Sequence, residues 1–209
     1  MDWSRAAVFI DFDGTISTRD TGLHMLERLA PHESRGIEDQ YLLGQIGSLQ
    51  CMVEQWRLLP KDRELIETLV REAPIDPAFP QLVERLRALD SRVTVLSDGY
   101  GFRARQVAAE AGVDVLTNDI DWDAFEVVFS RRDSSCPCSA CGTCKPEPIL
   151  AAQRQGMTAV LIGDGPSDAR AAEVADFVFA IGGLADWCEE QGIAHHRIAR
   201  LADLLAILS

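Results

Sequence analysis

Asp11 and Asp13 directly follow an apolar run at residues 6–10 and are the first side chains whose spacing suggests chemistry. The run is typical of a buried strand, and on a strand a spacing of two residues points both side chains the same way. Because two adjacent carboxylates repel each other, the pair indicates a bound cation, or a nucleophile beside a proton shuttle. Gly14 then allows the backbone to turn sharply and to approach a ligand closely.

Further polar residues follow two other strand-like runs, and a lysine precedes the second of them. These residues are Ser97, Asp98 and Gly99 after the run at 93–96, Asp164 and Asp168 after the run at 160–162, and Lys145 upstream. A hydroxyl and a glycine-loosened backbone at 97–99 suit the binding of an anion. Each piece alone also fits ordinary turn, helix-cap or surface chemistry. Their shared place at strand ends favours one common site.

The elements that must position these residues alternate along the chain. Strand-like runs occur at residues 8–10, 93–96, 113–116, 160–162 and 177–179, and amphipathic helical patterns at 81–89, 103–111, 148–155 and 167–175. This alternation predicts an α/β fold, a doubly wound parallel sheet with helices on both faces. In such a sheet, ligands bind beyond the carboxyl ends of the strands, where the candidate residues are expected.

The interval from residue 17 to residue 77 breaks the alternation because it is helical throughout. Helices are expected at 23–29, 40–46, 49–59 and 62–72. We interpret residues 17–77 as a helical cap inserted into a catalytic core of residues 1–16 and 78–209, because ordinary connections are far shorter. The alternative is an enlarged crossover between strands that has no function of its own.

Composition narrows the class of partner. The 209 residues are 47% apolar and 25% charged, as in ordinary globular proteins. The net charge of −13 argues against a nucleic-acid surface and against binding to anionic membranes. No run approaches the roughly 18 apolar residues of a membrane span, and the N-terminus leads into the first strand with no room for a signal peptide. We therefore expect a cytoplasmic protein.

This ordered set of segments resembles the four motifs of the haloacid dehalogenase superfamily. The motifs correspond here to residues 11–15, Ser97, Lys145 and residues 163–168. Within the superfamily, the chain is most similar to the phosphoserine-phosphatase-like branch. It is especially similar there to methionine-salvage phosphatases that act on 2-hydroxy-3-keto-5-methylthiopentenyl-1-phosphate. That closer likeness rests on Cys-Gly-Thr-Cys-Lys-Pro at 141–146 and Ala-Glu-Val-Ala-Asp at 172–176.

The resemblance implies a Mg²⁺-dependent phosphatase that works through an aspartyl-phosphate. Asp11 is then the nucleophile, and Asp13 the acid and base for the leaving group and the water. The implied metal ligands are the side chains of Asp11 and Asp164 and the carbonyl of Asp13, with Asp168 just outside them. The implied phosphate-binding residues are Ser97, Asp98, Gly99 and Lys145. Dehalogenases of the superfamily lack the acid that Asp13 provides, which favours a phosphatase or a phosphotransferase.

Four cysteines precede or flank the lysine motif: Cys136, Cys138, Cys141 and Cys144. Four thiolates could hold a structural Zn²⁺ that fixes the loop carrying Lys145. The alternatives are reduced thiols, a local disulfide and an iron–sulfur ligand set.

A cap over the site favours a small phosphorylated metabolite as the partner. Asp20, Arg57 and Tyr100 are the candidates for substrate specificity. One rival function is a phospho-acceptor signalling domain, although such domains are shorter and have neither a cap nor a Gly-Asp-Gly-x-x-Asp loop. A second rival is a zinc-knuckle interaction module that has lost catalysis, which the intact acids disfavour. The sequence indicates no oligomeric state.

Overall fold

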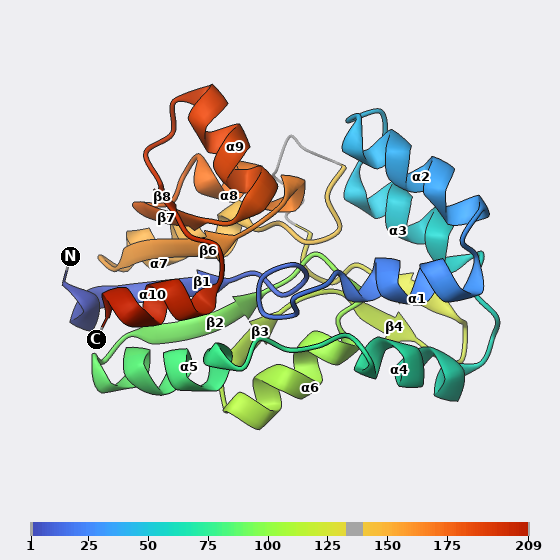
Figure 1. Ribbon diagram of the computed structural model, residues 1–209, viewed down its shortest axis with the longest axis horizontal. Coiled ribbons are helices and arrows are strands. Elements are labelled where there is room, and N and C mark those ends of the chain that lie inside the picture. The colour runs from blue at the N-terminus through green and yellow to red at the C-terminus, as the bar shows by residue number, and fades with distance from the viewer. Residues whose placement is uncertain (1, 133–139, 209) are drawn as a thin grey trace.

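A parallel sheet forms the centre of the computed structural model, which describes residues 2–132 and 140–208 (Figure 1). Within the described residues, the sheet has six strands in the order β3-β2-β1-β6-β7-β8, and every pairing is parallel. The strands are β1 (Ala6–Ile10), β2 (Arg92–Leu96), β3 (Asp114–Leu116), β6 (Thr158–Gly163), β7 (Phe177–Ala180) and β8 (His196–Arg197). The α/β class and the parallel sheet predicted from the sequence are therefore confirmed.

Helices cover both faces of this sheet. One face carries α5 (Ala78–Ala88), α6 (Phe102–Ala111) and α10 (Leu201–Ile207), and the other carries α7 (Pro146–Arg154), α8 (Ala169–Ala172) and α9 (Gly182–Gln191) (Figure 1). Strand β1 is buried along its whole length because its alternate side chains enter the two different cores. A strand buried on both faces reads as a continuous apolar run, which explains the pattern at residues 6–10.

The predicted insertion contains four helices: α1 (Thr21–Leu29), α2 (Glu33–Leu42), α3 (Ser48–Trp56) and α4 (Arg63–Arg71). Helices α1, α3 and α4 share a third apolar core with an antiparallel hairpin, β4 (Asp119–Asp121) and β5 (Glu126–Val128), which the sequence did not predict, and α2 packs against α3. Trp56 anchors the contact, because its indole Nε1 donates to the carbonyl of Phe125 at 3.0 Å and its ring lies 5.1 Å from that of Tyr100. The helical insertion is thus packed on residues outside its predicted bounds.

Two predicted helices differ most from the observed ones. The helix expected at 40–46 lies earlier, at α2, and residues 43–47 form a turn. Gly44 ends the helix with a left-handed backbone at φ +68°, a conformation that glycine adopts without strain. The helix expected at 167–175 is divided into a 3₁₀ turn at Pro166–Asp168 and the short α8. A second 3₁₀ turn, Trp3–Arg5, precedes β1.

The described helices are short, and the longest of them, α5, has 11 residues. A helix that crosses a bilayer needs about 20 predominantly apolar residues. Accordingly, none of the helices in the described part of the chain has the length and apolar character that a membrane span requires.

Candidate functional site

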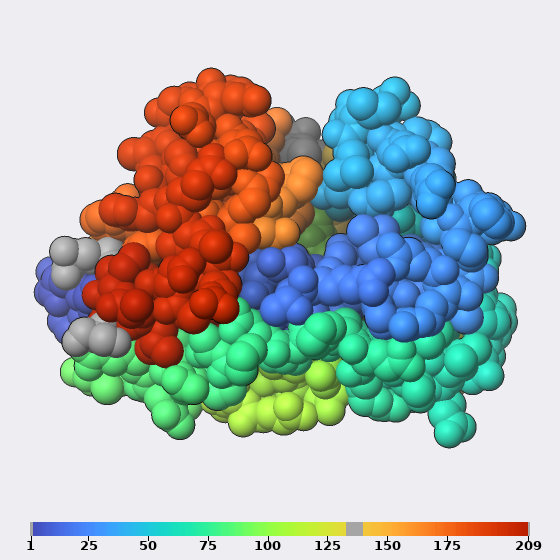
Figure 2. All heavy atoms as spheres, viewed as in Figure 1, coloured from blue at the N-terminus to red at the C-terminus, as the bar shows by residue number. Residues whose placement is uncertain are grey.

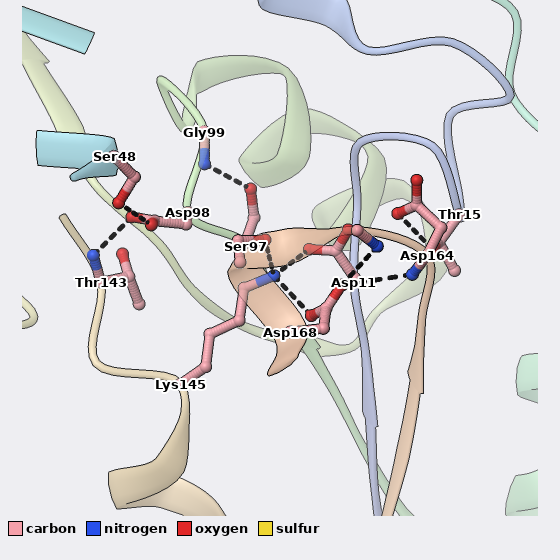
Figure 3. Close-up of polar contacts among 12 residues, drawn as sticks. Asp11, Thr15, Ser48, Ser97, Asp98, Gly99, Thr143, Lys145, Asp164 and Asp168 are labelled. Atoms are coloured by element: carbon pink, nitrogen blue, oxygen red, sulfur yellow. Dashed lines mark hydrogen bonds and ion pairs between the residues drawn. The ribbon is translucent and has the colours of Figure 1, made fainter. Parts of the chain in front are cut away.

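The carboxyl ends of the central strands bring the predicted motifs together. Asp11 directly follows β1, and its backbone N–H still donates to the carbonyl of Ile162 in β6 at 2.8 Å. Asp164 directly follows β6, and Ser97 directly follows β2. Because these strands are neighbours in the sheet, the three segments meet at one edge (Figure 3).

Lys145 lies at the centre of this edge and is only 1% exposed. Its ammonium Nζ donates to Asp11 Oδ1 at 2.5 Å, to Asp168 Oδ1 at 2.7 Å and to Ser167 Oγ at 2.9 Å. Burial alone would lower the pKa of Lys145, but the charges of Asp11 and Asp168 raise it above its ordinary value. The lysine is therefore a fixed cation between two carboxylates.

Asp11, Asp164 and Asp168 form an acidic cluster, with one carboxylate oxygen of each within 4.8 Å of the others. Burial, and then the charge of Asp168, raise the pKa of Asp164 to about 6 and that of Asp11 well above its ordinary value. Three acids beside a single lysine leave an excess of negative charge in a buried place. Hard oxygen donors in this arrangement fit a divalent cation such as Mg²⁺.

Neighbouring groups orient the acids of this cluster. Asp168 Oδ2 accepts from the backbone N–H groups of Asp164 and Gly165 at 3.2 and 3.3 Å, which leaves Oδ1 for Lys145. Thr15 Oγ1 donates to Asp164 at 3.2 Å.

Gly14 allows the close approach of Asp164 to the first motif. A Cβ at Gly14 would overlap the Asp164 carboxylate, and the backbone of Gly14 has φ +84°, so both space and conformation require glycine.

Asp13 is held apart from this cluster. Its Oδ1 accepts from the backbone N–H and the hydroxyl of Thr21, at 2.8 and 2.6 Å, at the start of α1. Burial, and then the charge of Asp20, outweigh these hydrogen bonds and raise the pKa of Asp13 to about 7. Its carboxyl group can therefore exist with or without a proton near neutral pH, unlike an ordinary surface aspartate.

In the loop after β2, the side chains of Ser97 and Asp98, both expected to bind phosphate, point in different directions (Figure 3). Ser97 is buried, and its Oγ accepts from the backbone N–H of Gly99 at 3.0 Å. The Asp98 carboxylate points away from Lys145, toward Ser48 and Thr143 (Figure 3). The binding of phosphate by Asp98 stays a prediction, which this placement disfavours because the Asp98 charge is engaged by other donors and would repel a phosphate.

A cavity of about 430 Å³ opens over the acids, between the helical insertion and the segment that follows β6. The surface is hollowed between the blue α2–α3 region and the orange α8–α9 region (Figure 2). Residues of the insertion and of the loop after β2 that line it include Asp20, Glu38, Tyr41, Cys51, Met52, Gln55 and Tyr100. We call Asp11 and Asp164, which line the cavity, together with Lys145 and Asp168, which are bonded to them below the lining, the floor of the cavity. Its wall is largely helical and consists of the lining residues of the insertion and Tyr100.

Two of the three specificity candidates, Asp20 and Tyr100, line this cavity, and the third does not. Arg57 follows the end of α3 and is exposed to solvent, outside the lining. Gln55, two residues earlier on the same helix, lies in the cavity instead, because two residues turn a helix by about 200°. Sequence reasoning also missed Glu38, whose carboxylate accepts from Gln55 Nε2 at 2.9 Å. No motif marks these wall residues.

The structure does not assess the predicted zinc site. Cys136 and Cys138 lie outside the described residues, so only Cys141 and Cys144 of the four belong to the described chain. Among described residues, the one group that could hold a metal ion is the cluster of Asp11, Asp164 and Asp168. The structural Zn²⁺ stays a prediction.

Comparison with known proteins agrees with this geometry. Two relatives, from Brevibacillus brevis and Bacillus pumilus, are named 2-hydroxy-3-keto-5-methylthiopentenyl-1-phosphate phosphatase. The first is 28% identical over 98% of this chain and 95% of its own length, and the second 29% identical over 95% and 89%. Among solved structures, a substrate-bound phosphoserine phosphatase has a TM-score of 0.76 at 17% identity over 98% of both chains. At this level of identity, the similarity to phosphoserine phosphatase concerns the fold alone.

The sequence model of one family matches residues 8–173, a span that includes all four motif segments and most of the chain. The same segments meet at one edge of the sheet, as the resemblance implied. The match confirms the superfamily that the motifs indicated. The chain belongs to the haloacid dehalogenase-like hydrolase family.

Proposed function

We propose that the chain is a Mg²⁺-dependent phosphatase that hydrolyses the monoester of a small metabolite through an aspartyl-phosphate on Asp11. The observation that carries this proposal is the buried Lys145 ammonium, which bridges Asp11 and Asp168 inside an acidic cluster. Phosphoryl transfer depends mainly on positioning and on electrostatic stabilisation of the equatorial oxygens. A fixed cation beside a carboxylate nucleophile provides both.

In this proposal, a carboxylate oxygen of Asp11 forms a bond to phosphorus as the bond from phosphorus to the ester oxygen breaks. Asp13 gives its proton to the departing alkoxide, and its pKa of about 7 allows it to carry that proton near neutral pH. Asp13 then accepts a proton from the water that attacks the phosphorus, which releases inorganic phosphate and restores Asp11. Lys145 and Ser97 bind the phosphoryl oxygens.

The side chains of Asp11 and Asp164, with the carbonyl of Asp13, are the residues that would hold Mg²⁺. The excess of negative charge in the cluster and the hard oxygen donors support this choice. When bound, the ion supplies positive charge that neutralises the acids and favours the transition state over the ester. Asp168, which is engaged with Lys145 and two backbone amides, orients the lysine.

The proposal assigns residues 17–77 to a cap that selects the substrate and residues 1–16 and 78–209 to the catalytic core. Helices α1 to α3 supply the wall of the cavity, which supports this division. Hydrolysis of a small ester benefits from a covered site, because excluding bulk water strengthens the electrostatic interactions there. A large phosphoprotein fits a cavity of about 430 Å³ poorly.

The charges of the wall favour a substrate whose organic part has no carboxylate. The lining contains Asp20, Glu38 and Gln55, and its one arginine, Arg19, forms an ion pair with Glu27. A distal carboxylate would face these acids without a partner, which is costly. Phosphoserine carries such a carboxylate, whereas 2-hydroxy-3-keto-5-methylthiopentenyl-1-phosphate does not. Cys51 and Met52 add an apolar surface that suits a thioether.

Phosphate release from a panel of esters, with and without Mg²⁺, tests the proposal. The panel contains 2-hydroxy-3-keto-5-methylthiopentenyl-1-phosphate (the methylthio-keto ester), phosphoserine and a sugar phosphate. We expect Mg²⁺-dependent release, fastest from the methylthio-keto ester. Preference for phosphoserine would overturn the substrate choice alone. No release from any ester, together with slow loss of a phosphoryl group from the protein itself, would favour a phospho-acceptor domain, and transfer to an added alcohol would favour a phosphotransferase.

A further inference from the structure

We propose that Asp98 is a positioning residue that ties the substrate-facing helix α3 to the loop that carries Lys145. One carboxylate would then hold the helical wall of the cavity and its catalytic lysine in register. The kinetic part of this inference rests on the proposed function, but the structural link does not.

On the core side, Asp98 holds the segment just before Lys145. Its Oδ1 accepts from the backbone N–H of Thr143 at 2.5 Å and from Asn118 Nδ2 at 3.3 Å. Thr143 Oγ1 in turn donates to Asn118 Oδ1 at 3.1 Å. Thr143 is buried and lies only two residues before Lys145. A shift of Asp98 would therefore reach the lysine through two peptide units.

On the other side, Asp98 and the same loop form the start of helix α3. The hydroxyl of Ser48 donates to Asp98 Oδ2, and the backbone N–H of Gly142 donates to Ser48 Oγ at 3.2 Å. The N-cap of α3 is Gly47, which has no side chain to satisfy the first turn. The Leu49 N–H donates instead to the carbonyl of Ala140 at 3.0 Å. The helix thus begins on the loop, with a carboxylate near its positive end.

The two segments are in close contact, as two glycines indicate. A Cβ at Gly142 would lie 2.5 Å from Asp98 Oδ1 and 3.0 Å from Asn118 Nδ2. A Cβ at Gly47 would overlap Ala140. Neither glycine has a positive φ, so their shared property is the absence of a side chain, which allows the close approach.

This contact joins two regions with different tasks. Helix α3 presents Cys51, Met52 and Gln55 to the cavity, and the loop presents Lys145 to Asp11. Because Asp98 accepts hydrogen bonds from both, a displaced helix would disturb the position of the lysine. We expect substrate contact with α3 and the reactivity of Asp11 to depend on each other through this residue.

A double-mutant cycle of Asp98→Ala and Ser48→Ala tests the link in the full-length protein. Loss of hydrogen bonds to a charged group should lower kcat/KM by about 10- to 100-fold in Asp98→Ala. Ser48→Ala should have a smaller effect, and the double variant should be no worse than Asp98→Ala alone, because both remove the same link. Asp98→Asn, which keeps an acceptor for Thr143, should restore part of kcat. If the fold loss of kcat/KM in the double variant equals the product of the fold losses in the two single variants, the proposal is wrong.

Matched controls separate the link from general stability. Asp176 accepts from the Ala159 N–H at 2.7 Å at the opposite end of the sheet, and the Ser91 hydroxyl donates to the Trp3 carbonyl at 2.7 Å. Asp176→Ala and Ser91→Ala should lower the melting temperature while keeping kcat and KM within about twofold of the wild type. A comparable kinetic loss in these controls would show that Asp98 acts only through stability.

Hydrogen exchange gives a readout that needs no catalysis. In Asp98→Ala, the amides of Leu49 and Thr143 should exchange faster together, by at least about tenfold, whereas Ser91→Ala should leave both protected. If only one of the two amides responds, the proposal is wrong. If both respond in a protein that hydrolyses no phosphate ester, the link stands and the proposed phosphatase function fails.

Discussion

The acidic floor of the cavity and its helical wall hold their polar groups in different ways. On the floor, Lys145 and Asp168 are buried and bound to each other, and each has further partners. On the wall, Glu38 and Gln55 bond to one another at 2.9 Å. Their further contacts are long, from Cys51 Sγ to Glu38 at 3.9 Å and from the Tyr100 hydroxyl to Gln55 at 3.4 Å. Groups locked by several contacts suit a reaction common to a whole family, whereas loosely held groups on helices can change with the substrate.

The difference extends to electrostatics. The floor combines three acids with one lysine, so each of its charges depends on the others. The wall has a thiol, a thioether and an amide beside its acids, so it selects by shape and hydrogen bonding. We therefore expect changes on the floor to abolish turnover and changes on the wall to alter KM.

Asp11→Asn should have the largest effect. It keeps the size of the side chain but removes the nucleophile, so kcat should fall by at least ~10⁴-fold. Steady-state phosphate release measures this, and Asp176→Asn is the matched control at the far end of the sheet. Substantial residual turnover in Asp11→Asn would show that Asp11 is not the nucleophile.

Lys145→Met should cause the second largest loss of kcat. It leaves Asp11 and Asp168 buried without their cation, so kcat should fall by about 10²- to 10³-fold. Breaking a buried ion pair should also cost about 3–5 kcal/mol in the free energy of unfolding. Lys61, the other lysine of the chain, lies over the ring of Phe125, and Lys61→Met is the control. Equal losses in both variants would contradict the central role of Lys145.

The metal-free protein should lose stability as pH rises from about 4 to about 7. Burial raises the pKa values of Asp13 and Asp164 from 3.8 to about 7 and about 6, so the folded state binds protons that the unfolded state releases. Stability is therefore greatest below the unfolded pKa and falls until the folded pKa is passed. The loss is about 1.4 kcal/mol for every tenfold difference in proton affinity between the folded and unfolded states.

Mg²⁺ should flatten this pH profile, because the cation replaces the protons as the source of positive charge. Thermal unfolding at several pH values in EDTA and in excess Mg²⁺ makes the comparison. A metal-free profile that rises between pH 4 and pH 7, or one that Mg²⁺ leaves unchanged, would count against the acidic cluster as the metal site.

The wall should give the smallest effect. Gln55→Ala removes one hydrogen-bonding group from the cavity, so KM should rise by about 5- to 10-fold with little change in kcat. Gln50, which is exposed on the same helix and bonds to Glu54, is the matched control. A fall in kcat with constant KM would mean that Gln55 belongs functionally to the floor.

The floor could be predicted from the sequence because its residues follow buried strands at fixed offsets. Asp11 and Asp164 each come directly after an apolar run, and parallel strands bring such positions together. The wall could not be predicted in the same way, since the rotation of each helix depends on tertiary packing. Arg57 was selected where Gln55 faces the cavity, a difference of two residues on α3.

The contacts of Asp98 and the presence of the hairpin could not be predicted, for related reasons. The glycine beside Asp98 suggested an anion site, but the orientation of the carboxylate depends on Ser48, fifty residues earlier in the chain. Strands β4 and β5 have three residues each, too few for a clear alternation of apolar and polar side chains. Long-range contacts and very short elements leave little local signal.

Trapping the covalent intermediate tests the central claim most directly. Turnover with Mg²⁺ and 2-hydroxy-3-keto-5-methylthiopentenyl-1-phosphate is quenched in acid within milliseconds. The protein is digested with pepsin at low pH, where the acyl phosphate survives, and the peptide that contains Asp11 is examined by mass spectrometry. The account predicts one phosphoryl group on this peptide, located by fragmentation at Asp11 and absent in Asp11→Asn. Steady turnover with no phosphorylated peptide, or with the phosphoryl group on another residue, would contradict it.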